Sequence, residues 1–452
     1  MTGPAPARTA LSRRGVLRLG VIGTAAAAAP ALAGCARQSE DGGGLSFAQF
    51  FGPSSENAAQ NAWFTQLVRD WNDQSGIEVE LDYIPANEYQ NGSSLQAEFS
   101  AGDGPDIFVV SSGEFLRYYN GGALVDLTPY MTGEAIDDFF PELMEARKVD
   151  GGIFALPMGG GPMAMYYHVP ILEQAGYSEA DLPHTWDAML EMAERLTTAE
   201  RFGVMFETTP GYYQNFTWYP FMWMAGGELP ALDSGARPFA VPGTARAAEL
   251  WGSAVRRGTA PRRALGTSGS DIVANLGAGY CAFQNIGMWG ISAMAAGKPD
   301  LEYGIMPLPR PDEATPTVTA TGGWCFAANA YGPRPEEAAE FCVWAVGSME
   351  RDSVERVASW CTSANSYLPY RRSSMRAAEE MGAFDDPGFA RFRDEIFPSA
   401  RSEPRVSPEM NRAISDFVQA VQLTGTDADR ALEEAAANLD GIMSRYTGAP
   451  PV

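Results

Sequence analysis

The sequence is poor in histidine and in basic residues, and each shortage argues against certain kinds of active site or binding partner. Its 452 residues include two histidines, His168 and His184, and 32 Lys and Arg against 56 Asp and Glu, which gives a formal net charge of −24. So few imidazoles argue against a histidine-based metal centre and against a Ser-His-Asp mechanism. The acidic charge argues against nucleic acid and anionic lipid headgroups as partners, because it would repel both.

The sequence also lacks the common motifs of catalysis and cofactor binding. It contains no metal-ligand spacing, no phosphate-cradling glycine loop, no nucleophile elbow and no internal repeat. It therefore predicts a protein that is not an enzyme and that carries neither a metal nor a cofactor.

The apolar run near the N-terminus, residues 19–33, is too short to span a bilayer comfortably. It lies between basic residues and a small-residue junction, which is the pattern of a signal peptide, predicted here for residues 1–34. Residues 12–17 resemble a twin-arginine signal, and residues 32–35 resemble a bacterial lipobox, in which Cys35 receives a lipid. We expect an exported lipoprotein, held on the outer face of the cytoplasmic membrane through Cys35 and a flexible tether of residues 35–44. An ordinary secretory signal with an incidental cysteine is the alternative.

Four further cysteines follow the tether: Cys281, Cys325, Cys342 and Cys361. An exported protein can form disulfides, and four cysteines allow three pairings that the sequence does not separate. We expect Cys281 to be unpaired, because a bridge from it to any of the others would join two lobes.

The remaining length is too great for one ordinary hydrophobic core and predicts two domains or lobes. Near its start, strand, helix and strand patterns between residues 45 and 83 form a βαβ unit, which implies a parallel sheet. Further patterns predict strands at residues 106–110 and 321–328 and a helix beginning over residues 270–276. The sequence thus predicts an α/β fold.

The strand at residues 106–110 is apolar after its first residue, Asp106, so we expect it to be buried on both faces. Ligands of open α/β sheets bind just beyond the carboxyl ends of the strands. Ser111, Ser112 and Glu114 follow this strand directly and are therefore candidate binding residues.

Two turns contain further candidates. Gly160 and Gly161 belong to a run of three glycines, which permits close approach of the backbone to a ligand; a mobile loop is the alternative. The turn at residues 287–290 carries Trp289, whose ring could stack on a ligand or pack in the core.

Residues 211–227 contain seven aromatic residues among seventeen. Flat rings bordered by amides such as Gln214 suit a ligand with apolar faces and a hydroxylated rim, as in a sugar. A helix this rich in apolar residues cannot face a cleft on every side. We therefore expect the residues from Phe221 onward to be core and Phe216 or Trp218 to face the ligand.

Short segments spread over residues 45–445 have the order and spacing of a known family. They are Ala101-Gly-Asp-Gly-Pro-Asp-Ile107, Gly122-Ala-Leu-Val-Asp-Leu127, residues 150–157, Tyr166-Tyr167, residues 183–187, Ala225-Gly-Gly227, Gly287-Met-Trp289, Gly322-Gly-Trp324 and Tyr367-Leu-Pro-Tyr-Arg371. Together they resemble the extracellular solute-binding proteins of bacterial ABC importers, in the sugar-binding family that includes maltose-binding protein. The resemblance implies a two-lobe periplasmic-binding-protein fold of type II, with hinge crossovers. It implies a first lobe of residues 45–156 plus 311–362 and a second of residues 157–310 plus 363–452.

The resemblance also assigns the walls of a site between the lobes. One wall would consist of Glu56, Asn57, Ser111, Ser112 and Glu114. The other would consist of Gln214, Phe216, Trp218 and Trp289, with Trp324 and Arg371 near the hinge. Many relatives carry an acidic side chain where this chain has Gly160 and Gly161, so sugar hydroxyls would meet backbone groups there.

The function that the resemblance implies is a lipid-anchored receptor, usually monomeric. It would bind a sugar, by expectation an oligosaccharide, in the cleft and deliver it to the permease subunits of an ABC importer without covalent chemistry. Two alternatives stay open. Glu56 and Glu114 could serve a secreted glycosidase. The solute could also be a polyamine, because rings with several carboxylates favour a cation, whereas rings with amides and hydroxyls, of which the sequence shows more, favour a neutral polyol.

Overall fold

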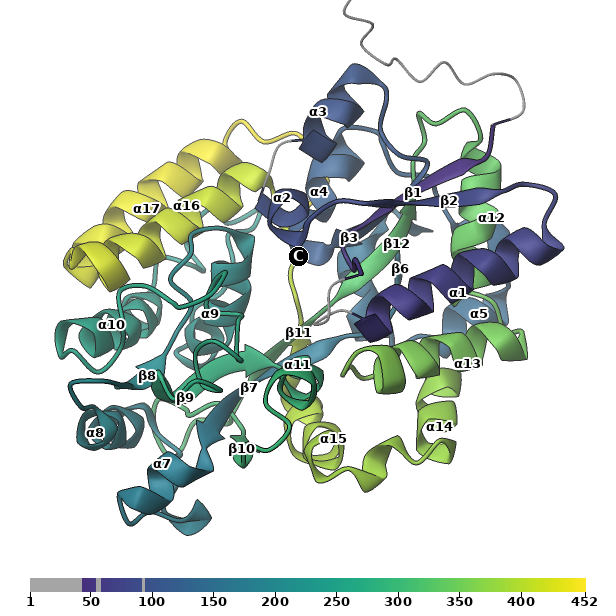
Figure 1. Ribbon diagram of the computed structural model, residues 1–452. Coiled ribbons are helices and arrows are strands. Elements are labelled where there is room, and N and C mark those ends of the chain that lie inside the picture. The colour runs from purple at the N-terminus through teal and green to yellow at the C-terminus, as the bar shows by residue number, and fades with distance from the viewer. Residues whose placement is uncertain (1–42, 54–57, 92–93) are drawn as a thin grey trace, which may run out of the picture. The chain divides into compact units, whose positions relative to one another are not determined.

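Two β-sheets, each covered by its own helices, organise the chain from Gly44 onward (Figure 1). The computed structural model describes residues 43–53, 58–91 and 94–452, so the predicted signal peptide, Cys35, Glu56 and Asn57 lie outside the described residues. The first sheet has the strand order β2-β1-β3-β12-β6. Its strands are β1 (Leu45–Gln49), β2 (Val79–Tyr83), β3 (Ile107–Ser111), β6 (Leu156–Pro157) and β12 (Trp324–Ala328). The first three run parallel, and β12 is antiparallel to β3 and β6.

The predicted strand–helix–strand unit is confirmed: α1 (Ala58–Gln74) connects the parallel strands β1 and β2. Successive side chains of a strand point to opposite faces of a sheet. Phe47 on β1 therefore packs on Phe64 of α1, and Phe108 on β3 packs on the other face against Phe99 and Tyr118. These two rings come from α3 (Ser94–Ala101) and α4 (Ser112–Asn120), so helices cover both faces of the first sheet.

The second sheet has the order β13-β11-β7-β9-β8, and β10 also pairs with β7. Its strands are β7 (Gly161–His168), β8 (Phe202–Met205), β9 (Cys281–Gly287), β10 (Tyr303–Met306), β11 (Thr319–Gly322) and β13 (Ala400–Ser402). Every residue of β7 is buried, because the strand lies inside the sheet. A short hairpin pairs β4 (Lys148–Val149) with β5 (Gly152–Ile153).

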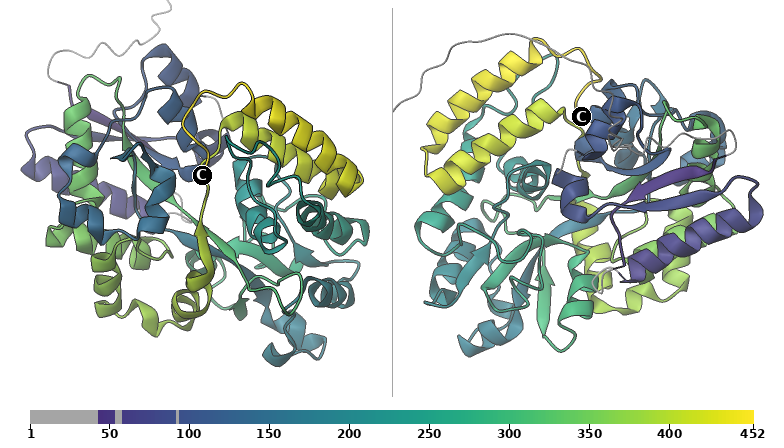
Figure 2. Two further views of the ribbon diagram at one scale, coloured as in Figure 1. Left: turned by 180° about the vertical axis from the view of Figure 1, so that it is seen from behind. Right: turned by 45° about the horizontal axis from the view of Figure 1, so that its top comes forward.

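Four helices pack on one another beside the second sheet: α9 (Tyr212–Met224), α10 (Pro242–Arg256), α16 (Pro408–Gln419) and α17 (Ala428–Met443). Figure 2 shows α16 and α17 side by side from two directions. The aromatic stretch forms α9, in which every residue from Gln214 to Met224 is buried. This confirms that the residues from Phe221 onward are core.

The other helices lie on the two sheets or between these elements. They are α2 (Ala86–Asn91), α5 (Gly133–Asp138), α6 (Pro141–Met144), α7 (Val169–Gln174), α8 (Trp186–Leu196), α11 (Gly290–Gly297), α12 (Pro335–Val346), α13 (Arg351–Ser359), α14 (Arg372–Glu380) and α15 (Pro387–Arg391). In α8 the Thr185 hydroxyl accepts a hydrogen bond from the Ala188 N–H and so caps the helix.

The chain passes between the sheets along segments that lie side by side. Residues 158–160 join β6 to β7, and Gly323 joins β11 to β12. A Cβ on Gly323 would lie 2.2 Å from the Gly159 carbonyl oxygen, so the approach of these two segments requires glycine. Gly160 exchanges backbone hydrogen bonds of 3.0 and 2.9 Å with Leu368 of a third segment. The crossings therefore form a narrow connection between the two lobes, and α4 also contacts α9 and α16 across them.

Two predictions of secondary structure are wrong. The strand predicted at residues 321–328 is two strands, β11 and β12, which bend apart at Gly323 into different sheets. The change of sheet thus falls at Gly323. The helix predicted over residues 270–276 is a series of turns, in which the Asn275 side chain accepts from the Leu265 N–H and donates to the Asp271 carbonyl.

The four cysteines of the described chain, Cys281, Cys325, Cys342 and Cys361, are buried and unpaired. This confirms the expectation for Cys281, and none of the three possible pairings of the four cysteines is formed. No disulfide among these residues restrains the two lobes.

Candidate functional site

A cavity of about 410 Å³ lies beyond the first sheet, at the edge where β1 and β3 end. Phe50 and Phe51 directly follow β1, and Ser111 is the last residue of β3. Trp324 begins the antiparallel strand β12 and is paired with Ser111, so its ring belongs to the same edge. The rule that ligands bind at the carboxyl ends of parallel strands thus describes this wall of the cavity.

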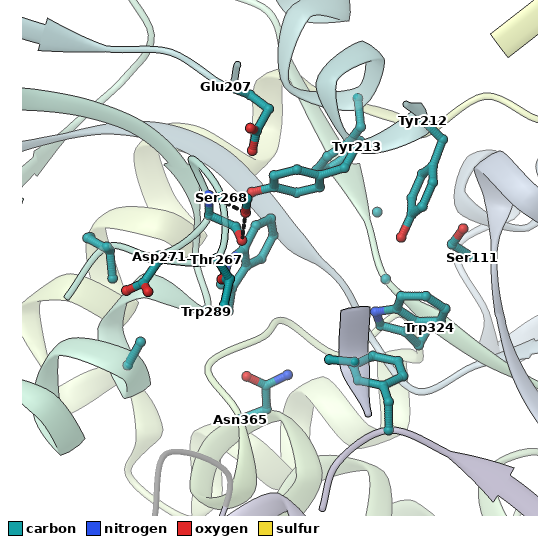
Figure 3. Close-up of a pocket in the computed structure, with 18 of the residues that line it drawn as sticks. Ser111, Glu207, Tyr212, Tyr213, Thr267, Ser268, Asp271, Trp289, Trp324 and Asn365 are labelled. Atoms are coloured by element: carbon teal, nitrogen blue, oxygen red, sulfur yellow. Dashed lines mark hydrogen bonds between the residues drawn. The ribbon is translucent and has the colours of Figure 1, made fainter. Parts of the chain in front are cut away.

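The opposite wall is formed by α9 and by loops of the second lobe. Tyr212 and Tyr213 flank the face of α9 that carries Phe216, because residues four and three apart lie together on a helix. Beyond them lie polar side chains of the loop from Thr267 to Val273 and the ring of Trp289 (Figure 3). The remaining lining residues are Gln60, Ala86, Glu207, Thr209, Pro210, Gly211, Ser292, Ala293, Gly322, Gly323, Asn365, Tyr367 and Glu403.

Trp289 is the centre of an aromatic wall. Its ring centroid lies 6.3 Å from that of Phe216 in a stacked arrangement, 6.2 Å from Tyr213 and 6.3 Å from Tyr367. Three neighbouring rings fix the orientation of the indole, and such ring pairs contribute about 0.5–1.5 kcal/mol each beyond their buried area. Trp289 therefore presents a rigid apolar surface to the cavity.

Glu207 is a buried carboxylate at one end of the cavity. The side chain is 2 % exposed, and its Oε1 accepts hydrogen bonds from the backbone N–H groups of Thr208, Thr209 and Gly269 at 2.8, 2.8 and 3.2 Å. Its Oε2 has no hydrogen-bond partner among the described residues. Burial raises the pKa of Glu207, and hydrogen bonds from the three backbone N–H groups and from the Thr209 side chain partly offset that rise.

Glu403 is a second buried carboxylate, in the segment after β13. A Cβ on Gly113 of α4 would lie 2.9 Å from one of its oxygens, and a Cβ on Gly322 would lie 2.7 Å from the other. Glu403 therefore fills the space between the two walls. Burial raises the pKa of Glu403 to about 8, against the opposing effects of Arg147 and the Gly113 N–H. At neutral pH this carboxyl holds its proton.

The lining of the cavity is acidic. Glu207, Asp271 and Glu403 line it, and no Lys, Arg or His is among the lining side chains of the described residues. These carboxylates do not form a metal centre, because no group of three His, Cys, Asp or Glu side chains suited to an ion occurs in the described part of the chain. The cavity therefore combines rings, hydroxyls and carboxylates.

A family model for bacterial extracellular solute-binding proteins matches residues 55–350, more than half of the chain. The chain belongs to this family. Its members are solute-binding proteins and not enzymes, which confirms the prediction that this protein is not an enzyme.

Individual relatives of this solute-binding protein agree in sequence and in fold. A Deinococcus radiodurans protein called "Probable ABC transporter-binding protein" is 25% identical over 391 residues, 84% of this chain and 89% of its own length. An ABC transporter solute-binding protein of Thermotoga lettingae bound to α-D-tagatose aligns with a TM-score of 0.74 and 20% identity, over 89% of this chain and 100% of that one. UgpB of Mycobacterium tuberculosis, in complex with glycerophosphocholine, aligns with a TM-score of 0.72 and 20% identity, over 89% of this chain and 99% of that one. The predicted two-lobe, maltose-binding-protein-like fold is confirmed.

Four residues predicted to bind ligand line the cavity of this solute-binding protein. They are Ser111, Phe216, Trp289 and Trp324. Gly161 lies directly behind two lining rings, because a Cβ there would meet Trp289 at 2.8 Å and Tyr367 at 3.0 Å. The absence of a side chain at residue 161 thus gives these rings their positions.

The other predicted residues of the described chain do not line the cavity. Trp218 is fully buried and packs on Phe417 of α16. It follows Phe216 by two positions in α9 and therefore lies on a different face of that helix. Gln214 bonds to Gln422 and Ser415, and Arg371 forms a buried ion pair of 3.0 Å with Asp138. Ser112 is buried at the start of α4, Glu114 pairs with Arg117 at 2.7 Å, and the Tyr370 hydroxyl occupies the side-chain space of Gly160.

Sequence reasoning missed Tyr212, Tyr213, Glu207 and Glu403. The two tyrosines lie within the aromatic stretch, and helical spacing from Phe216 would have placed them beside it. Glu207 follows the end of β8, so the rule that singled out Ser111 after β3 would also have found it, had β8 been recognised. No local signal points to Glu403, because its place depends on contacts with α4, distant in sequence.

Proposed function

We propose that this solute-binding protein captures a saccharide in the cavity between its two lobes and passes it to the permease of an ABC importer. The observation that carries the proposal is the aromatic wall around Trp289, bordered by the hydroxyls of Tyr212 and Ser111 and the amide of Asn365 (Figure 3). Flat rings suit the apolar faces of a sugar, and the polar groups suit its hydroxylated rim. The tagatose bound by the Thermotoga lettingae relative supports this choice.

The cavity volume supports a ligand of one or a few sugar rings. About 410 Å³ lies within the range of roughly 300–1,000 Å³ of small-ligand sites. Of the predicted contacts, Ser111, Phe216, Trp289 and Trp324 are those we propose for the ligand, together with Tyr212 and Tyr213. The narrow connection at Gly159 and Gly323 would let the lobes close around the solute.

The test is a thermal-shift and tryptophan-fluorescence screen of residues 44–452, which form a compact unit of their own. Mono- and oligosaccharides are compared with spermidine as a cation without a sugar ring. A saccharide that binds the folded state raises the melting temperature by mass action. A shift with spermidine and none with any saccharide would contradict the proposal, and release of reducing ends from a glycoside would establish the glycosidase instead.

We further propose that the chain is a monomeric lipoprotein of the extracytoplasmic face, anchored through Cys35. Its membership of an extracellular family and the lipobox-like residues 32–35 support the anchor. Within the described residues, no helix is both long and apolar enough to cross a membrane. The anchor is tested by expressing the full chain and its Cys35→Ser variant in the presence of a labelled fatty acid. The full chain is expected to carry the label and to associate with membranes, and the variant is expected to do neither. Equal membrane association of both would contradict it.

A further inference from the structure

The end of the cavity formed by Glu207, Tyr213 and the loop carrying Ser268 and Asp271 has acceptors that the protein does not satisfy. Glu207 Oε2 and the Tyr213 hydroxyl have no hydrogen-bond partner among the described residues. The Tyr213 hydroxyl points toward the Glu207 carboxylate in Figure 3. Burial raises the pKa of the Tyr213 phenol, and the Glu207 carboxylate adds to that rise. Both groups line the cavity, and in Figure 3 they lie beside Ser268.

The backbone fixes this carboxylate in place. Three N–H donors converge on Oε1, so Glu207 cannot turn away without losing all three bonds. The other oxygen consequently stays at the cavity surface with the side chain only 2 % exposed. A buried acceptor without a donor costs free energy. A ligand with several donors can supply one to Glu207 Oε2 and another to the Tyr213 hydroxyl oxygen.

The charge of the lining decides which donor fits best. Asp271 lies on the neighbouring loop, with Oδ1 accepting from the Ala274 N–H at 2.9 Å, and no basic side chain among the described lining residues opposes these acids. A hydroxyl offers one donor and no charge, whereas an ammonium offers three donors and a positive charge. The faces of Tyr213 and Trp289 add a second attraction for a cation.

We propose that the solute is a saccharide that carries an ammonium group, with the cation bound at Glu207 beside Tyr213 and the sugar ring against Trp289. This inference rests on the proposed function and names the substrate class of the same site. It differs from a site for a neutral sugar in one measurable respect, which is a preference for the amino sugar over its hydroxyl counterpart.

The experiment measures dissociation constants by calorimetry on residues 44–452 for matched probes. These are glucose and glucosamine, galactose and galactosamine, mannose and mannosamine, and chitobiose and its deacetylated diamine. At least one amino sugar is expected to bind about tenfold or more tightly than its neutral counterpart, as for a cation held by a carboxylate and a ring face. Glu207→Gln keeps the side-chain shape and an acceptor for the backbone N–H groups, so it should remove this preference.

Two control variants distinguish the loss of the Glu207 charge from a general effect of substitution on folding. Tyr213→Phe removes one hydroxyl and should reduce the preference in part, whereas Glu191→Gln on the exposed face of α8 should leave it unchanged. Neutral sugars that bind as tightly as their amino counterparts, or a preference that survives in Glu207→Gln, would overturn the inference and leave the saccharide function intact. Binding of spermidine without any saccharide, or of no probe, would overturn both.

Discussion

The two walls of the cavity differ in chemistry. The wall from the first lobe presents the rings of Phe50, Phe51 and Trp324 and the hydroxyl of Ser111, without an acidic or basic side chain among its described lining residues. The wall from the second lobe presents rings as well, but it also carries the carboxylates of Glu207 and Asp271. The difference indicates that the second lobe recognises the polar and charged groups of the solute, while the first lobe covers its apolar face and excludes water.

The rings are also held differently on the two walls. Trp289 is supported by Tyr213, Phe216 and Tyr367, all lining residues themselves. Trp324 has two ring neighbours, Phe50 at 4.6 Å and Tyr89 at 6.0 Å, against three for Trp289, and both indoles are partly buried. A rigid ring loses less conformational entropy when a ligand stacks on it. The second lobe is therefore expected to contribute more to affinity than the first.

The largest expected effect concerns Glu403, which lies where the walls meet. Its pKa is about 8 in the folded protein against an ordinary value of 4.5, so between these values the folded state holds a proton that the unfolded state releases. The contribution of Glu403 to the free energy of unfolding is then complete below about pH 4.5. It decreases as the pH rises to about 8, with a slope of at most about 1.4 kcal/mol for each pH unit. Glu403→Gln should remove this part of the slope in urea unfolding measured at pH 5, 6, 7 and 8. Parallel pH profiles of the variant and the wild type would show that Glu403 is ionised in the folded protein.

Trp289→Ala should weaken saccharide binding by ~1–3 kcal/mol, because it removes the ring at the centre of the aromatic wall. Calorimetry with the best saccharide of the screen measures the change. Trp344→Phe is a matched control, since that half-buried ring packs on Arg356 and Trp71 and does not line the cavity. An unchanged affinity in Trp289→Ala would mean that the ring serves packing alone.

Trp324→Ala tests the first wall and should cost less, about 1 kcal/mol or below, because neighbouring Phe50 and Phe51 still cover the ligand. The same titration gives the value. A larger loss for Trp324→Ala than for Trp289→Ala would reverse the proposed roles of the two lobes.

The sequence predicted the fold more fully than it predicted the site. The βαβ start, the buried strand β3 and the family's two-lobe fold follow from local patterns or from the resemblance, and the structure confirms them. The choice between Phe216 and Trp218 could not be made, because α9 is apolar on all sides and has no polar face to set its orientation. Glu114 and Arg371 have the right chemistry for a site, but each has an ion-pair partner elsewhere, which only the fold reveals.

The acids of the cavity show the same limit. Composition marks the chain as acidic without telling which of its 56 Asp and Glu residues converge. Glu207, Asp271 and Glu403 come from three segments far apart in sequence, and long-range packing alone brings them to one cavity. The sequence favoured amides and hydroxyls in the site, whereas the structure adds these carboxylates, and the expected ligand changes accordingly.

The most direct test of the account is a crystal structure of residues 44–452 with the tightest saccharide from the matched panel. The account predicts one sugar ring stacked on Trp289 between the two walls, with a ligand nitrogen donating to Glu207 Oε2. A saccharide bound outside this cavity, or bound in it with Glu207 Oε2 contacting no ligand donor, would contradict it.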